Sequence, residues 1–253
     1  MTFDRKNNKE ITNTSIRQKI MKKALICLAL LMSACIGSKA QYQKGDLFLY
    51  PRVGFALANV SQQELYYVIG NESHKSKMKN GLTAGIEAEV FANNFLSVSA
   101  GLFYANQGLR YADWAQENKA ERTYSILEDI YTTMHYINLP ILLNGYLTEG
   151  LAIKAGLQLG YLVKAQDYIH EKWGNIEEGN LYVDKGETVF DEDVTSNFNR
   201  MDLSIPIGIS YEYNHIVLDL RYNLGLTKVY KNTPDKQGRH QVLTFTLGYQ
   251  LGL

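Results

Sequence analysis

Residues 243–253 read Leu-Thr-Phe-Thr-Leu-Gly-Tyr-Gln-Leu-Gly-Leu, and this stretch governs the interpretation of the whole chain. Every odd position is bulky and apolar, and every even position is small or polar. Because successive side chains of a strand point to opposite faces, the strict alternation predicts a strand with one apolar face and one thin polar face. Such a strand belongs either to the edge of a soluble sandwich or to a barrel, and the rest of the chain decides between them.

Seven further segments alternate in the same way. Each is about 9–13 residues long, which is enough for a tilted strand to cross a bilayer. They are Leu47–Leu57, Leu82–Val90, Phe95–Gln107, Tyr136–Leu147, Leu151–Val163, Met201–Tyr213 and Ile216–Leu226.

The connections between these segments alternate in length. Short ones cover residues 92–94, 148–150 and 214–215, long ones cover residues 60–80, 111–133 and 166–200, and one of intermediate length covers residues 230–241. Short turns at one end and longer loops at the other are typical of outer-membrane barrels. We therefore predict an all-β fold, an eight-stranded antiparallel up-and-down transmembrane β-barrel, with both mature termini in the periplasm.

The volume of the side chains decides which face of the barrel is outside. A soluble, lipocalin-like barrel would place the apolar face inside, but eight strands leave an interior that side chains just fill, and about forty bulky side chains exceed it. Small residues inside and bulky ones outside require a lipid exterior, where each buried methylene is favourable by ~0.8 kcal/mol.

The polar face carries isolated charges that strand parity directs into the lumen. Since a lone buried charge is unfavourable, we expect three bases to pair with five carboxylates and close the barrel to solutes. Removal of Arg221 is then expected to leave its partners uncompensated, at ~3–5 kcal/mol. The predicted network consists of Arg52, Glu87, Glu89, Lys154, Asp202, Glu212, Asp219 and Arg221, with Glu212 within reach of Asp219.

Four tyrosines on the apolar face are placed to form girdles at the membrane interfaces. We expect Tyr104 and Tyr161 near the outer interface, and Tyr213 and Tyr249 near the periplasmic one.

The front of the chain predicts export. Met21-Lys22-Lys23 opens a basic region, residues 24–36 are apolar, and Ser-Lys-Ala at residues 38–40 fits a cleavage site between Ala40 and Gln41. We therefore divide the chain into residues 1–20, a mis-assigned or dispensable extension; 21–40, a signal peptide; and 41–253, the barrel domain. The alternative is lipidation of Cys35.

Charge and cysteine content exclude several function classes. Both cysteines lie at 27 and 35, so the mature chain offers no thiol chemistry. Removing the first 40 residues, which hold 8 Lys and Arg and 2 Asp and Glu, leaves 18 bases and 24 acids, net −6. This acidic balance gives no basic surface for a nucleic-acid partner. We also expect no cofactor, and no metal, because the five histidines lack the spacing of metal ligands.

The loops hold a few polar groups that deserve a chemical interpretation. Asp167 and His170 are expected near His135 if the fourth and fifth strands pair, which keeps open a protease-like site at the outer rim. The acidic run at residues 187–193 lacks a calcium-loop pattern and is interpreted as a solvated loop. The composition of residues 112–122 favours a short helix.

Two motifs resemble those of known outer-membrane proteins. The chain end resembles the C-terminal signal that barrel-assembly machinery reads during insertion, with Thr246, Gly248, Leu251 and Leu253 in the signal positions. The run Tyr-Ile-Asn-Leu-Pro-Ile-Leu-Leu at residues 136–143 resembles the fourth-strand hallmark of the PorT-like outer-membrane β-barrel family of Bacteroidetes-type bacteria. Residues 202–213 and 221–226 resemble later pieces of that family in the same order.

The PorT-like resemblance implies a bacterial outer-membrane protein. It also implies a proline in the fourth strand, so we expect Pro140 to interrupt the hydrogen-bond ladder locally. The namesake of the family is linked to protein secretion. Our leading hypothesis is a non-enzymatic monomeric barrel in outer-membrane lipid with a structural, surface-interaction or secretion-related role and an envelope protein partner. The alternatives are a small porin and a membrane-embedded enzyme.

Overall fold

A computed structural model describes residues 42–61, 64–66, 73–178, 181–231 and 238–253. The predicted signal peptide and the Ala40–Gln41 cleavage site lie outside the described residues.

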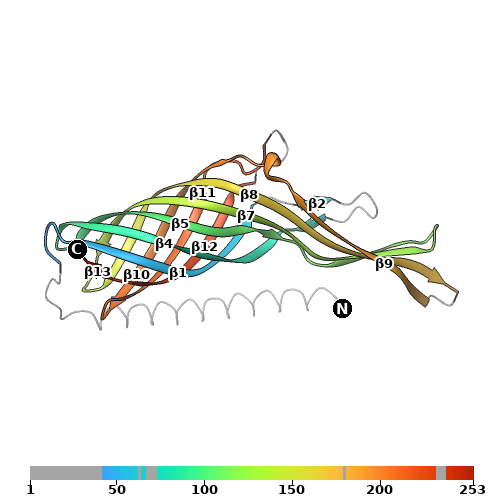
Figure 1. Ribbon diagram of the computed structural model, residues 1–253, viewed down its shortest axis with the longest axis horizontal. Helices are drawn as coiled ribbons and strands as arrows, with labels where there is room; N and C mark the ends of the chain where they lie inside the picture. The colour runs from blue at the N-terminus through green and yellow to red at the C-terminus, as the bar shows by residue number, and fades with distance from the viewer. Residues whose placement is uncertain (1–41, 62–63, 67–72, 179–180, 232–237) are drawn as a thin grey trace, which may run out of the picture. The chain divides into compact units, whose positions relative to one another are not determined.

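Eight antiparallel strands close into a ring, which confirms the predicted up-and-down barrel (Figure 1). Each strand pairs with its neighbour in the chain, and the ring closes where the first strand pairs with the last. The strands are β1 (Leu47–Val60), β4 (Lys77–Asn93), β5 (Leu96–Arg110), β7 (Thr123–Tyr146), β8 (Leu151–Glu177), β10 (Met201–Tyr213), β11 (Ile216–Gly225) and β12 (His240–Tyr249).

Five further strands and one 3-10 helix complete the described structure. The strands are β2 (Glu64–Tyr66), β3 (Ser73–Lys75), β6 (Trp114–Asn118), β9 (Leu181–Asp193) and β13 (Leu251–Gly252), and the helix is η1 (Thr195–Asn197). Within the described ranges, no helix has the length and apolar character needed to cross a membrane.

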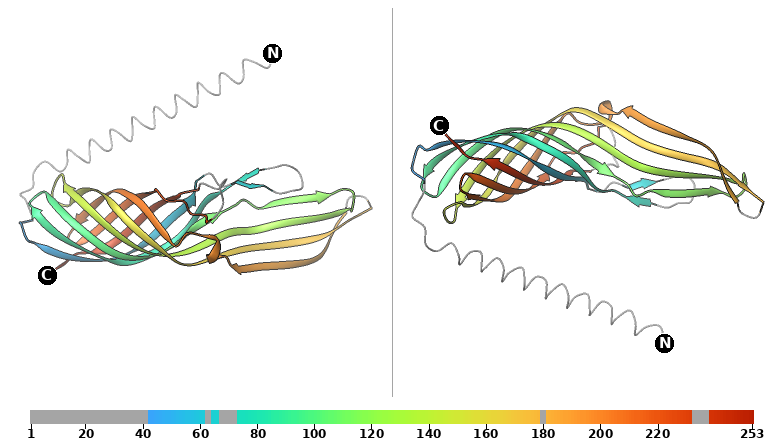
Figure 2. Two further views of the ribbon diagram at one scale, coloured as in Figure 1. Left: turned by 90° about the horizontal axis from the view of Figure 1, so that it is seen from above. Right: turned by 60° about the horizontal axis from the view of Figure 1, so that its bottom comes forward.

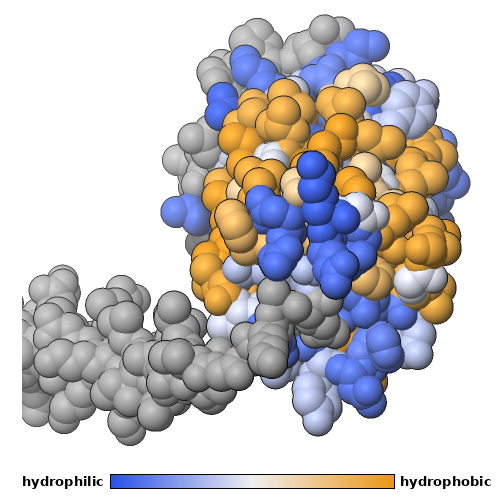
Figure 3. Space-filling model, turned by 90° about the vertical axis from the view of Figure 1, so that its left-hand side faces the viewer, coloured by the Kyte–Doolittle hydropathy of each residue, from blue (hydrophilic) through white to orange (hydrophobic). Residues whose placement is uncertain are grey.

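The two faces of the ring separate as the alternation predicts. Phe55, Leu102 and Leu157 are 62%, 57% and 55% exposed on the outside, whereas Glu87 and Lys154, on the other parity, are buried. Figure 3 looks onto one end of the barrel and shows apolar side chains over much of that face, with hydrophilic ones near its centre. An apolar exterior around a polar interior is the arrangement that lipid stabilises.

The short connections are tight turns, and all of them lie at one end of the barrel, which we call the turn end. Asn214 and His215 adopt φ values of 50° and 68°, as a two-residue type I′ hairpin requires. Asn93 accepts backbone hydrogen bonds from residues 95 and 96 through its side-chain oxygen, at 3.0 and 2.9 Å. The chain end lies here too, since the Leu253 N–H donates to the Leu47 carbonyl at 3.0 Å.

Two of the expected long loops are in fact strands. β7 and β8 have 24 and 27 residues, far more than the ring needs, and continue beyond it. β6 pairs with the outer part of β7, and β9 pairs with the outer part of β8. The result is a four-stranded sheet, and we call the residues that form and connect it, 112–133 and 166–193, the extension. Figures 1 and 2 show it projecting from the end opposite the turns.

Two expectations about these segments are wrong. The segment at residues 112–122, where a helix was expected, forms strand β6 and the turn after it, because pairing with β7 overrides a modest helix propensity. The acidic run at residues 187–193 lies in β9 rather than in a loop, although its charged side chains are exposed as expected.

Prolines interrupt the ring locally, as expected for the fourth strand. Pro140 pairs with Gln158 on the β8 side, but the β5 ladder is broken between Ala100–Ile141 and Phe103–Asn138. The missing N–H of proline explains why one neighbour loses its pairing there.

The filled lumen and the extension as candidate functional sites

Five charged side chains from four strands meet in the middle of the lumen, and we call them the central cluster. Arg52 (β1), Glu87 (β4), Lys154 (β8), Asp219 and Arg221 (both β11) are each at most 7% exposed. The strand register makes room for them, because Gly248 lies opposite Arg52 and Gly208 lies opposite both Lys154 and Arg221.

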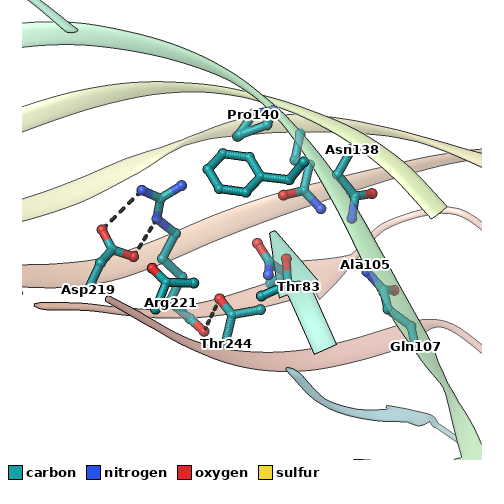
Figure 4. A pocket seen from close by; sticks show the side chains of 12 residues that line it. Thr83, Ala105, Gln107, Asn138, Pro140, Asp219, Arg221 and Thr244 are labelled. Carbon is teal, nitrogen blue, oxygen red and sulfur yellow. Dashed lines mark hydrogen bonds and ion pairs between the residues drawn. The ribbon is translucent and has the colours of Figure 1, made fainter. Parts of the chain in front are cut away.

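Each of the three bases contacts both carboxylates. Arg52 lies 3.0 Å from Glu87 and 2.7 Å from Asp219, and Lys154 lies 3.3 Å from each. Arg221 lies 2.6 Å from Glu87 and 2.7 Å from Asp219, the latter pair visible in Figure 4. The angles at Arg52 fall short of hydrogen bonds, so this guanidinium is held as an ion-pair partner. Three bases against two acids give the central cluster a formal charge of +1.

The cavity beside the central cluster is small. It has a volume of about 30 Å³, enough for about one water molecule. Thr83, Asn138, Gln158 and Thr244 line it together with Arg221 (Figure 4). The charges therefore lie in a nearly dry interior, where an unpaired charge is unfavourable.

Aromatic side chains fill the lumen at the turn end. The ring of Tyr42 stacks on Phe91 with centroids 4.1 Å apart, and Tyr146 lies 5.0 Å from both. Their hydroxyls satisfy two buried carboxylates: Tyr42 donates to Glu212 at 3.0 Å and Tyr146 to Glu89 at 2.7 Å. This layer closes the end of the lumen next to the turns.

Apolar side chains fill the opposite end. A buried cluster joins β1, β5, β7 and β8 with the segments that follow β5, η1 and β11. Its members are Val60, Leu109, Tyr111, Leu127, Ile130, Met134, Tyr136, Leu162, Ala165, Phe198 and Val229. Below it, the Tyr136 hydroxyl and His240 Nε2 lie 3.0 Å apart in a buried pair. The lumen is thus occupied along its length by three layers: aromatic, charged and apolar.

The eight predicted lumen charges are all buried, but they do not form one network. Five of them make the central cluster, while Glu89 and Glu212 belong to the aromatic layer. Asp202 accepts a hydrogen bond from Thr227 at 2.7 Å near the other end. The register places Asp219 opposite Ser210 and Glu212 opposite Val217, and the Glu212 carboxylate accepts hydrogen bonds from Tyr42 and Gln250.

The four predicted girdle tyrosines are all exposed, at 41–73%. Tyr213 and Tyr249 both pair with Ile216 beside the Asn214–His215 turn, and Tyr104 and Tyr161 both pair with Ile137 farther along the barrel. Each pair of tyrosines therefore lies at its own level along the barrel axis, as two separate girdles require.

The structure does not assemble the Asp/His group considered at the rim. His135 lies opposite Lys164 in the register and its Nδ1 is 2.6 Å from the hydroxyl of Tyr104. His170 lies opposite Glu128, and its Nε2 is 3.1 Å from Glu187. In the part of the chain that the structure describes, no group of His, Cys, Asp and Glu is arranged to hold a metal ion.

The extension is a strongly acidic polar sheet. Residues 112–133 and 166–193 contain 14 Asp and Glu against four Lys and Arg, a net charge of −10. Lys172 donates to Glu128 at 2.7 Å, a bond that lowers the pKa of Glu128 and raises the pKa of Lys172. The rings of Tyr131 and Tyr168 stack with centroids 5.0 Å apart.

Our sequence prediction missed the extension and the aromatic layer, although signals for both exist. Residues 123–133 and 181–190 are rich in β-branched and aromatic side chains, which favour strands. Tyr50, Phe91 and Tyr146 have the parity of the polar face, so bulky rings inside the lumen were readable from the alternation.

The ring of eight strands with an apolar exterior and a charged interior defines a small outer-membrane β-barrel. The chain belongs to the outer membrane protein beta-barrel domain family, whose model matches residues 40–231. None of the curated proteins matches the chain.

Several solved structures are similar to this chain. Ail, the attachment invasion locus protein of Yersinia pestis, has 13% identity and a TM-score of 0.39, covering 83% of this chain and 100% of its own. Neisserial surface protein A has 12% identity and a TM-score of 0.38, covering 81% and 97%. OprG from Pseudomonas aeruginosa has 10% identity and a TM-score of 0.37, covering 85% and 100%.

Proposed function

We propose that this protein is a non-enzymatic, non-conducting outer-membrane barrel that holds the extension at the cell surface as an interaction module. The observation that carries the proposal is that β7 and β8 run without interruption from a filled barrel into a four-stranded polar sheet. The barrel supplies a rigid base, and the sheet supplies the exposed surface.

The orientation of the barrel is part of the proposal. Short turns and the mature chain ends face the periplasm in barrels of this kind, so the extension lies outside the cell. Its net charge of −10 keeps it in water rather than in lipid. On the PorT-like resemblance, we further propose that the barrel has an envelope protein partner and a secretion-related role.

Cysteine labelling tests the orientation. Because both cysteines lie at positions 27 and 35, the mature chain has none of its own, and Thr188→Cys and Asn94→Cys each introduce a single exposed thiol. A membrane-impermeant maleimide should label Thr188→Cys on intact cells, because Thr188 lies in the extension. The same reagent should label Asn94→Cys, at the turn end, only after the cells are lysed. Labelling of Asn94→Cys but not of Thr188→Cys on intact cells would reject the proposal.

A small porin is the second candidate, and the charged lumen favours it. The two functions differ in planar-bilayer conductance. The filled lumen predicts no steady conductance for the wild type, whereas a water-filled pore predicts a stable single-channel current. A stable current from the purified protein would put the porin first.

A further inference from the structure

We propose that the extension carries a binding site for neutral carbohydrate, built around Trp173. This deepens the proposed surface role and rests on it for access to ligands outside the cell. The site is a cavity of about 300 Å³, a size at the lower end for small-molecule sites. Trp173 and polar side chains of β6, β7 and β8 line it, together with the acidic residues Glu117 and Glu121.

Strand register places the lining residues in two adjacent rows on one face of the sheet. One row runs Gln116, Ser125, Trp173 across β6, β7 and β8. The next row runs Asn118, Thr123, Asn175 across the same strands. Alternation directs all six side chains to the same face, so one aromatic ring lies beside three amides and two hydroxyls.

Gly186 of β9 gives the indole a place to lie. A side chain at Gly186 would come within 3.0–3.5 Å of Trp173 ring atoms, so the ring rests over bare backbone. Trp173 is nevertheless 45% exposed. An indole supported on one side and open on the other is a flat apolar platform of fixed position.

The amides beside the platform are oriented for recognition. The side-chain oxygen of Asn118 accepts backbone N–H groups of Ala120 and Glu121 at 3.1 and 3.2 Å, which directs its NH₂ away from the turn as a donor. Gln116 Oε1 is buried and lacks a hydrogen-bond partner, a state that an incoming donor would relieve.

A pyranose ring has the matching chemistry. Its C–H groups form an apolar face that suits the indole, and its hydroxyls both donate to and accept from amides. The net charge of −10 on the extension disfavours sulfated or phosphorylated glycans by like-charge repulsion. We therefore expect the site to bind neutral sugars. Their source is either host glycans or the uncharged part of bacterial surface polysaccharide.

Fluorescence of a single tryptophan tests the site directly. The protein has two tryptophans, so Trp114→Phe leaves Trp173 as the sole reporter. The full barrel in detergent is titrated with cellobiose, chitobiose, N-acetyllactosamine and a neutral lipopolysaccharide core oligosaccharide, with heparin oligosaccharide as the polyanion. We expect a saturable emission change with at least one neutral sugar below about 20 mM and none with heparin; the responding sugar identifies the source of the ligand.

Single-residue variants distinguish binding at this site from non-specific binding. Isothermal titration calorimetry measures binding of the responding sugar to two variants that keep Trp114. Trp173→Ala removes the apolar contact and Gln116→Ala removes a hydrogen bond, so each should raise the dissociation constant of that sugar about tenfold or more. Phe190→Ala is the matched control, since Phe190 is 43% exposed on β9 outside the cavity, and it should bind like the wild type.

The proposal is overturned if every sugar of the panel fails to change Trp173 emission, or if Trp173→Ala binds as tightly as Phe190→Ala. The proposed surface role is tested separately by cysteine labelling, which needs no ligand. Labelling of Thr188→Cys on intact cells together with a negative sugar panel would reject the carbohydrate site alone.

Discussion

Removing one acid from the central cluster should destabilise the barrel more than removing one base. The wild type holds three bases and two acids, each base contacting both acids. Glu87→Gln leaves three bases around one carboxylate, a formal charge of +2. Arg221→Met leaves two bases and two acids, a formal charge of zero, because Arg52 and Lys154 still contact both carboxylates.

The magnitudes follow from this imbalance. Leaving uncompensated charge in a dry interior costs about 3–5 kcal/mol, and the cavity beside the cluster has room for about one water to relieve it. Arg221→Met loses charge-assisted hydrogen bonds at about 1.5–3 kcal/mol but leaves a balanced cluster. The structure thus corrects the expectation that loss of Arg221 leaves its partners uncompensated.

Urea unfolding of the barrel in detergent, followed by far-ultraviolet circular dichroism, measures the free energies of unfolding of the two single variants and of the double variant. The double variant restores the wild-type formal charge of +1, so it should lose less stability than the sum of the two single losses. Equal losses for Glu87→Gln and Arg221→Met, together with an additive double variant, would refute the electrostatic reasoning.

Three further predictions concern folding and pH. The purified mature barrel should be a β-rich, heat-modifiable monomer in detergent, and a helical circular dichroism spectrum or solubility without detergent would contradict it. Gly85→Leu should cost about 1–3 kcal/mol on urea unfolding by overpacking, because a Cβ at Gly85 would come within 2.6 Å of the Phe103 ring. The hydroxyl and N–H of Thr195 lower the pKa of Asp193, so the stabilisation they give is present above the ordinary carboxylate pKa of about 4 and is lost as the pH falls below it. Limited proteolysis should therefore show that the segment containing η1 opens in acid, and Asp193→Asn should flatten this pH dependence.

The sequence alone determined the ring of the barrel. The period-two alternation of each strand is a local property, and the type I′ turn at Asn214–His215 needs just two residues, so both can be read from the chain in order. The same alternation decided that Phe55 faces outward and Glu87 inward. Which of the inward charges would touch could not be read in this way, because contacts such as Arg221–Glu87 join residues 134 positions apart.

Tertiary structure decided what fills the lumen and what projects from it. The pairing of β7 with β8 continues through residues 123–133 and 166–177, and partners on both sides stabilise segments whose own composition suggested a helix or loops. Likewise Gln116, Ser125 and Trp173 become one surface through the register of three strands. Alternation fixes the face of each side chain, but pairing partner and register set its neighbours, and these depend on the whole sheet.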